Sequence, residues 1–265
     1  MAILANYHTH TPRCHHAKGS EEEYIETALR CGYQVLGFSD HSPWQFPSDF
    51  VSGCRMLPAQ LSGYVSTLRA LQQKYAGRIR IPIGLEAEYY PDCLPWLREQ
   101  KEKYQLDYLI FGNHFYYSEE LDLYFGMAKD ETRCRQYAES AAAGMESGLY
   151  CCMAHPDLFL YGYPAFDRTA ETVCREICAA AAHCGVVLEY NLLGEARRLH
   201  EPYGEGLGYT RPEFWQIAAE YPIKAIVGCD AHEPAALDVV PRLRAAQDAL
   251  RAKGIEVLET LPGLG

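Results

Sequence analysis

Short apolar runs that end in polar, chemically reactive residues recur along the chain. The runs are rich in Ile, Val, Leu and aromatic residues, and segments with helical features separate them, so we predict that they are strands. The predicted strands are Ile3–Tyr7, Val35–Ser39, Ile79–Leu85, Leu106–Phe111, Leu149–Ala154, Val186–Leu188 and Lys224–Val227. Near-continuous apolar strands that alternate with helices are typical of a parallel sheet covered by helices.

Cap residues and helical spacing mark the segments between these strands. Ser20 and Glu23 have the spacing of a capping box, and Gly32 follows as a stop signal. The predicted helices are Ser20–Gly32, Pro58–Gly77, Pro91–Gln105, Asp130–Gly148, Thr169–Cys184, Pro212–Tyr221 and Pro234–Gly254. The longest stretch predicted to be irregular is Leu192–Thr210, which contains five glycines or prolines. Loops of this length in a compact domain are more often functional than idle.

Histidines and acidic residues follow every predicted strand. The side chains of these strand ends that we expect to converge are His8, His10, His41, Glu86, His114, His155, Asp230 and His232. In a barrel of βα units all strand carboxyl ends share one face, so such residues converge although they are far apart in sequence. An open sheet would spread them along a line. We therefore predict an α/β fold of the seven-stranded, TIM-like barrel type, with a single domain over residues 1–265.

The converging side chains are typical metal ligands. Neutral imidazole and carboxylate bind Zn, Fe or Mn, and eight or nine such groups exceed what one ion can use. We therefore predict two or three divalent ions. His114 or His155, taken alone, could instead be a buried histidine that is hydrogen-bonded in the core. If every strand-end histidine had such a role, six imidazoles would be crowded in one place without a partner to bind. His183 and His200 have no paired ligand nearby and are predicted to be structural.

Composition restricts the partners. The 265 residues are 48% hydrophobic, which is enough for a large core, and the net charge of -11 argues against a nucleic-acid or anionic-membrane surface. A phosphorylated small molecule would have to be held by local cations. Eleven scattered cysteines without a C-x-x-C pair indicate reduced thiols, and no signal-peptide pattern or long apolar run is present. We expect a cytoplasmic protein, and the oligomeric state stays open.

Seven linked motifs resemble one known family. The runs HTHT, SDH, GLEAEY, GNH, AHPD, EYN and GCDAH occur in this order, and together they resemble the PHP (polymerase and histidinol phosphatase) family, in particular its histidinol-phosphate phosphatase branch. The resemblance implies a distorted (β/α)7 barrel with a trinuclear metal centre at the carboxyl ends of the strands.

The resemblance also implies a ligand set for each ion. One ion would be held by His8, His10, Glu86 and Asp230. Glu86 would bridge to a second ion, held also by His114 and His155. The third would take His41, His232 and a loop histidine, which is His16 by its offset, with His15 as the rival. Glu88, Asp40 and Asp157 would orient imidazoles from outside the ligand set.

The activity implied is hydrolysis of L-histidinol phosphate in histidine biosynthesis. A hydroxide that bridges two metals, held by Glu86, His8, His10, His114 and His155, would attack phosphorus. Candidate substrate-binding residues are Arg197, Arg198, Tyr209, Arg211 and Asn191. A guanidinium suits phosphate because it offers a planar two-donor fork. The general acid for the leaving group is not assigned.

Two other functions compete with this one. The chain departs from the family pattern by an extra residue before Arg197 and by the run Gly206–Pro212, so another small phosphate ester or a nucleotide is an alternative substrate. A non-catalytic metal-binding module predicts missing ligands, whereas every expected ligand position is filled. An amidohydrolase-type deaminase shares the His-x-His of the first strand, but this chain lacks the lysine that such enzymes carry after strand four.

Overall fold

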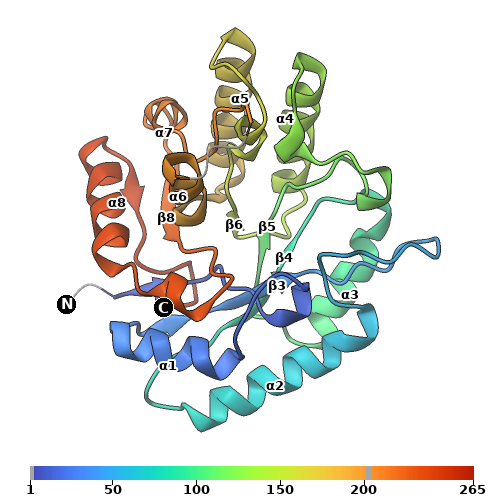
Figure 1. Cartoon of the computed structure of the whole chain (residues 1–265), viewed down its shortest axis with the longest axis vertical. Helices are drawn as coiled ribbons and strands as arrows, with labels where there is room; N and C mark the ends of the chain where they lie inside the picture. The colour runs from blue at the N-terminus through green and yellow to red at the C-terminus, as the bar shows by residue number, and fades with distance from the viewer. Residues whose placement is uncertain (1–2, 201–203) are drawn as a thin grey trace.

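The computed structural model describes residues 3–200 and 204–265, which form parallel strands surrounded by helices (Figure 1). β1 (Ala5–Asn6) pairs in parallel with β2 (Val35–Leu36). The remaining strands form one parallel sheet in chain order: β3 (Phe38–His41), β4 (Ile83–Ala87), β5 (Tyr108–Phe111), β6 (Cys152–Met153), β7 (Val187–Asn191), β8 (Lys224–Gly228) and β9 (Glu256–Val257). The predicted α/β fold with a parallel sheet is confirmed, and β9 is a strand that the sequence pattern did not indicate.

The two sheets approach each other at both edges. β2 and β3 are parts of one strand interrupted at Gly37, where a Cβ would lie 2.5 Å from the Tyr108 hydroxyl oxygen. At the other edge, Thr9 and Ala231 form an isolated parallel bridge: the His10 amide donates to the Ala231 carbonyl at 2.9 Å, and the Ala231 amide donates to the His8 carbonyl at 3.0 Å. The strands are therefore arranged in a ring. Between β1 and β8 the ring is joined by this single bridge and not by a continuous ladder of hydrogen bonds.

Alternate strand residues face two separate apolar cores. The inward core contains Tyr7, Tyr108 and Ile110 and is covered at one end by Leu261 and Leu264. The outward core lies between the strands and the helices. Because successive side chains of a strand point to opposite faces, Ile83 and Leu85 in the outward core place Glu86 on the inward face. The pleat therefore directs this carboxylate to the interior of the ring.

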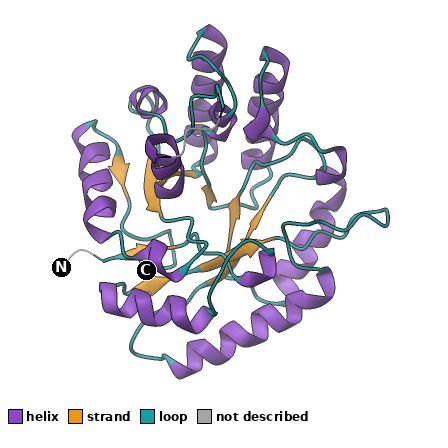
Figure 2. Ribbon diagram, viewed as in Figure 1, coloured by secondary structure: helices purple, strands orange, loops and turns teal. Residues whose placement is uncertain are grey.

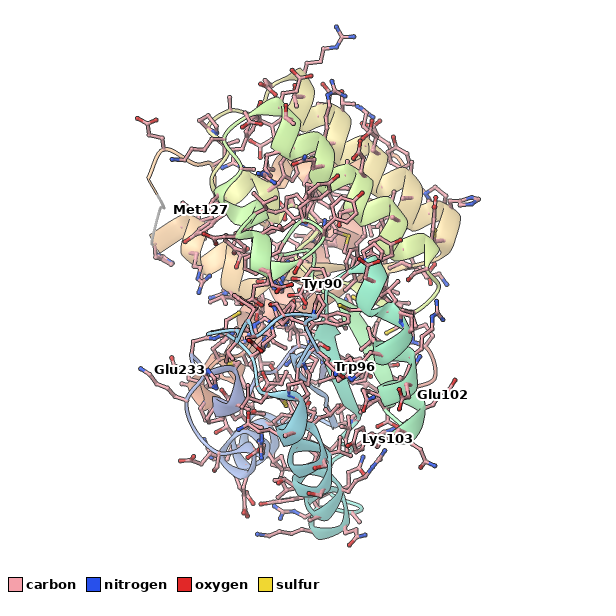
Figure 3. The ribbon with its side chains drawn as sticks, turned by 90° about the vertical axis from the view of Figure 1, so that its right-hand side faces the viewer. Tyr90, Trp96, Glu102, Lys103, Met127 and Glu233 are labelled. Carbon is pink, nitrogen blue, oxygen red and sulfur yellow. The ribbon has the colours of Figure 1, made fainter. Side chains whose placement is uncertain are left out.

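Eight α-helices lie around the strands in the described part of the chain (Figure 2). They are α1 (Glu21–Cys31), α2 (Leu61–Lys74), α3 (Leu94–Lys103), α4 (Glu131–Glu146), α5 (Arg168–Cys184), α6 (Leu192–His200), α7 (Pro212–Ala218) and α8 (Val240–Ala252). α3 shows their amphipathic character: Leu97 is buried, whereas Glu102 and Lys103 are exposed at the surface (Figure 3). The capping box predicted at Ser20 and Glu23 is present. None of the helices within residues 3–200 and 204–265 has the length and apolar character needed to cross a bilayer.

Two element predictions were wrong. The stretch Leu192–Thr210 was predicted to be irregular, yet its first half is the helix α6. Of its five glycines and prolines only Gly194 lies in that helix, and the Gly194 amide donates to the Asn191 side chain at 2.8 Å in the first turn. The helix predicted over Pro234–Gly254 is a 3-10 turn, Pro234–Leu237, followed by α8. Residues 201–203 lie outside the described residues.

Candidate metal centre

The carboxylate of Glu86, at the end of β4, lies at the centre of the converging strand ends. It is 1% exposed. Its Oε1 atom lies 3.0 Å from Nε2 of His155, which follows β6, and 3.3 Å from Nε2 of His114, which follows β5. The two imidazole nitrogens are 3.2 Å apart. One carboxylate oxygen therefore faces a pair of imidazoles from the two succeeding strands.

The other oxygen of Glu86 faces a second group. Oε2 lies 3.5 Å from Nε2 of both His8 and His10, which follow β1. These two nitrogens are 3.1 Å apart, and Oδ1 of Asp230, after β8, lies 3.3 Å from each. The i, i+2 spacing of the histidines and the bridge between Thr9 and Ala231 bring these three side chains together.

A third group of imidazoles lies beside the second. His41 Nδ1 is 3.0 Å from Oε2 of Glu86, and the ring centroids of His16 and His232 are 4.8 Å apart. His16 lines the same cavity as His41 and His232. His15 instead occupies a left-handed conformation with φ of 67° at the end of a 3-10 turn and is not among the residues that line this cavity. The geometry thus favours His16 over His15 as a ligand of a third ion.

These groups fit divalent metal ions. Ligand atoms bound to one ion at about 2.0–2.2 Å are neighbours at about 3.0–3.5 Å, and the separations around Glu86 are 3.0–3.5 Å. Oε2 of Glu86 is buried without a hydrogen-bond donor among the described residues. Burial opposes ionisation of Glu86 and Asp230, but the surrounding imidazoles hold the pKa of both carboxyls well below their usual values. The carboxylate is the form of these groups that binds metal.

Three acidic side chains contact the far nitrogens of these imidazoles. Glu88 accepts a hydrogen bond from Nδ1 of His114 at 2.9 Å, and Glu189 accepts one from Nδ1 of His8 at 2.9 Å. Oδ1 of Asp40 lies 3.5 Å from Nδ1 of His10. Such contacts fix the ring orientation and the tautomer. The sequence predicts this role for Glu88 and Asp40; Glu189, a strand-end carboxylate like the others, was not predicted to have it.

Asp157 does not contact an imidazole in this way. Its two oxygens accept the backbone amides of Thr210 and Arg211 at 3.0 and 2.7 Å. Burial raises the pKa of Asp157 to about 6, although both amides oppose the shift. Asp157 therefore holds the chain before α7 in place, and the prediction that it orients a histidine is corrected.

Glycines at two strand ends make room for the acidic side chains. A Cβ at Gly112, just after β5, would collide with Oε1 of Glu86, and a Cβ at Gly228, at the end of β8, would collide with Oε1 of Glu189. A side chain at either position would displace one of these carboxylates.

A cavity of about 290 Å³ opens above the metal-ligand groups. Arg197, on α6, and Tyr209 line its wall, together with apolar side chains that include Phe115, Tyr124 and Leu158. Arg197 forms no hydrogen bond or ion pair within the described ranges; burial opposes its charge, but Tyr209 and Asp230 raise the pKa of its guanidinium. The cavity thus combines a metal-ligand floor, one cation and an apolar wall.

The other predicted substrate-binding residues have partners or positions elsewhere. The Arg211 guanidinium donates to both oxygens of Glu213, at 3.0 and 2.6 Å. The side-chain nitrogen Nδ2 of Asn191 donates to the carboxylates of Glu189 and Asp230. Arg198 follows Arg197 on α6, and consecutive residues of a helix point about 100° apart. Arg198 therefore packs beside Gly208 and does not point into the cavity with Arg197. Of the candidates proposed from the sequence, Arg197 and Tyr209 are the ones on the cavity wall.

Comparison with known proteins agrees with this architecture. The model of the PHP domain family matches residues 6–192. A protein of Deinococcus radiodurans named a probable histidinol-phosphatase is 30% identical over 240 residues, which are 88% of this chain and 88% of that protein. The histidinol-phosphatase of Bacillus subtilis is 32% identical over 258 residues, which are 85% of this chain and 92% of the relative.

A solved structure has the same fold. The histidinol phosphate phosphatase of Lactococcus lactis, complexed with zinc, L-histidinol and phosphate, superimposes with a TM-score of 0.68 at 18% identity, over 96% of this chain and 95% of that one. The family match and the two relatives cover most of the chain, as the seven motifs had predicted. The chain belongs to the PHP domain family.

Proposed function

We propose that the protein is a metal-dependent phosphomonoesterase that hydrolyses L-histidinol phosphate to L-histidinol and phosphate. The observation that carries the proposal is the arrangement of Glu86, whose two oxygens face separate imidazole groups at the floor of a cavity. The names of the relatives from Deinococcus radiodurans and Bacillus subtilis support the substrate, as do the ligands of the Lactococcus lactis protein.

Three ligand groups would hold the ions. The first is His8, His10, Glu86 and Asp230; the second is Glu86, His114 and His155; the third is His16, His41 and His232. All of them are imidazoles or carboxylates, which suit zinc, iron or manganese. When bound, such ions supply an activated water and neutralise phosphoryl oxygens.

The chain itself would orient the substrate. Arg197 would hold the phosphate, because its guanidinium lies on the cavity wall, near Asp230 and Tyr209, without an ion-pair partner in the described ranges. The apolar wall, which includes Phe115 and Leu158, would exclude water and pack against the imidazole ring of the histidinol part of the substrate. Glu88 and Glu189 would keep His114 and His8 in fixed orientations.

A substrate panel tests the proposal. Purified protein, reconstituted separately with zinc, iron and manganese, would be assayed for phosphate release from L-histidinol phosphate, other small phosphomonoesters and nucleoside monophosphates. We expect the highest kcat/KM with L-histidinol phosphate. A higher value with another ester would support the alternative substrate that the unusual run Gly206–Pro212 suggests, and no hydrolysis of any ester would support the non-catalytic alternative.

A further inference from the structure

Arg55 is a buried arginine in the segment between β3 and α2. Its side chain is 2% exposed, and it lines the cavity above the metal-ligand groups. Its two terminal nitrogens donate to the two oxygens of Glu88, at 2.8 and 3.0 Å, and Nε donates to Glu119 at 2.7 Å. It also donates to the Ser42 carbonyl at 3.0 Å. One guanidinium thus joins the end of β4 to the segments that follow β3 and β5.

Glu88 receives donors on both oxygens. Oε1 accepts from Nδ1 of His114 at 2.9 Å in addition to Arg55, and Oε2 accepts from the indole nitrogen of Trp44 at 2.6 Å. The two-donor fork of Arg55 fixes the plane of the Glu88 carboxylate.

The orientation of the Glu88 carboxylate decides which ring nitrogen of His114 is free to bind a metal ion. A neutral imidazole carries one proton, so a ring that donates from Nδ1 to Glu88 presents an unprotonated Nε2. That Nε2 atom faces Oε1 of Glu86 at 3.3 Å and Nε2 of His155 at 3.2 Å. A rotated carboxylate would lose the acceptor that selects this tautomer.

We propose that Arg55 is a positioning residue, which clamps Glu88 so that His114 presents Nε2 to the second metal ion. Glu119 accepts a hydrogen bond from Nε of the same guanidinium, so the segment after β3 helps to orient a ligand on the segment after β5. The inference rests on the proposed function only in taking His114 as a metal ligand.

The variants Arg55→Gln and Arg55→Lys separate the planar fork from the charge. Because Arg55→Gln leaves two buried carboxylates without their cation, Arg55→Gln/Glu119→Gln serves as a second, better balanced variant. Arg175→Gln is the matched control, since Arg175, on α5, pairs with Glu171 and with Glu220 outside the cavity. Circular dichroism and the thermal midpoint of the metal-free proteins identify the folded variants.

Nitrogen-15 NMR of the zinc-loaded protein reads which ring nitrogen of His114 carries the proton, assigned with a His114→Gln variant. We expect the Nδ1-protonated tautomer in the wild type and in Arg175→Gln, and a mixture of tautomers in both Arg55 single variants and in the double variant. An unchanged tautomer in folded Arg55→Gln would overturn the proposal. Full restoration of the tautomer by Arg55→Lys would overturn the role of the planar fork.

Metal affinity supplies the second measurement, through competition with a chelator. We expect the affinity for one ion to fall about 10–100-fold in Arg55→Gln and in the double variant, the usual cost of losing a group that orients a ligand, while the other ions bind as in the wild type. Equal weakening of all ions together with a lower thermal midpoint would show a structural role only and overturn the proposal. Neither measurement uses a substrate, so failure of the phosphatase assay leaves this result independent.

Discussion

Replacing Glu86 by alanine is expected to remove more than one metal ion per chain. Each of its oxygens faces a different imidazole group, at 3.0–3.3 Å on one side and 3.0–3.5 Å on the other. Loss of the carboxylate therefore removes a ligand from two ions at once. Glu86→Gln has nearly the same volume but only one oxygen and no charge, so it separates the loss of the carboxylate from the effect of a cavity.

The magnitude follows from linkage between binding and folding. At a free-metal concentration about 100 times Kd, each site that binds only the folded chain adds about 2.7 kcal/mol to the free energy of unfolding. Loss of two sites therefore removes about 5 kcal/mol of metal-dependent stability. For a chain of this size that corresponds to a fall of roughly 10–20 °C in the metal-dependent part of Tm.

Two measurements check this expectation. Elemental analysis of the reconstituted protein should show a loss of more than one equivalent in Glu86→Ala, and thermal unfolding with and without zinc should show a correspondingly smaller shift of Tm. Glu195→Gln is the control, because this α6 carboxylate contacts Tyr190 and Arg242 rather than the imidazoles. Loss of a single equivalent, or of none, would refute the bridging role of Glu86.

Three further predictions test separate parts of the structure. His16→Ala should lose one metal equivalent by elemental analysis and His15→Ala none, and the reverse result would assign the ligand to His15. Arg197→Ala should lower kcat/KM by about 2–4 kcal/mol of transition-state stabilisation with unchanged metal content; a normal rate in this variant, with a damaged Arg198→Ala, would assign the phosphate contact to Arg198. Asp167→Ala removes the N-cap of α5. The Ala170 amide and the Tyr163 hydroxyl lower the pKa of this exposed carboxyl, although burial slightly opposes the shift. Denaturant unfolding of the variant should therefore show a loss of about 1 kcal/mol in the free energy of unfolding at neutral pH. The pKa of Asp167 is lower in the folded than in the unfolded chain, so the stabilisation by its charge is present above the unfolded-state pKa and disappears as the pH falls through the folded-state pKa. If Asp167→Ala lost as much stability at about pH 2 as at pH 7, this expectation would be contradicted.

The strands and their reactive ends could be predicted because both signals are local. An apolar run followed by histidine or acid is visible without knowledge of the fold, and the barrel argument then places Glu86 near His114 and His155. The beginning of α6 was missed because the glycines and prolines that follow His200 dominated the composition of that stretch. Its start depends on a side-chain contact from Asn191, which no spacing rule shows.

The groups that orient the imidazoles were harder to predict. Asp157 and Glu189 both follow strands, yet one accepts backbone amides and the other accepts an imidazole. Arg55 lies in a segment without any motif, and its contact with Glu119 joins residues 64 positions apart. Such contacts depend on where loops fold over the strand ends, and a strand pattern contains no information about that path.

The bridge between Thr9 and Ala231 determines when the metal centre can form. It aligns the His8 and His10 pair with Asp230, so the first ligand group draws on residues more than 200 positions apart. A growing chain that has not yet reached Asp230 has His8, His10 and Glu86 but lacks the second carboxylate of the group. The first ligand group can therefore be completed only after synthesis has passed β8, whereas Glu86, His114 and His155 of the second group are all present earlier.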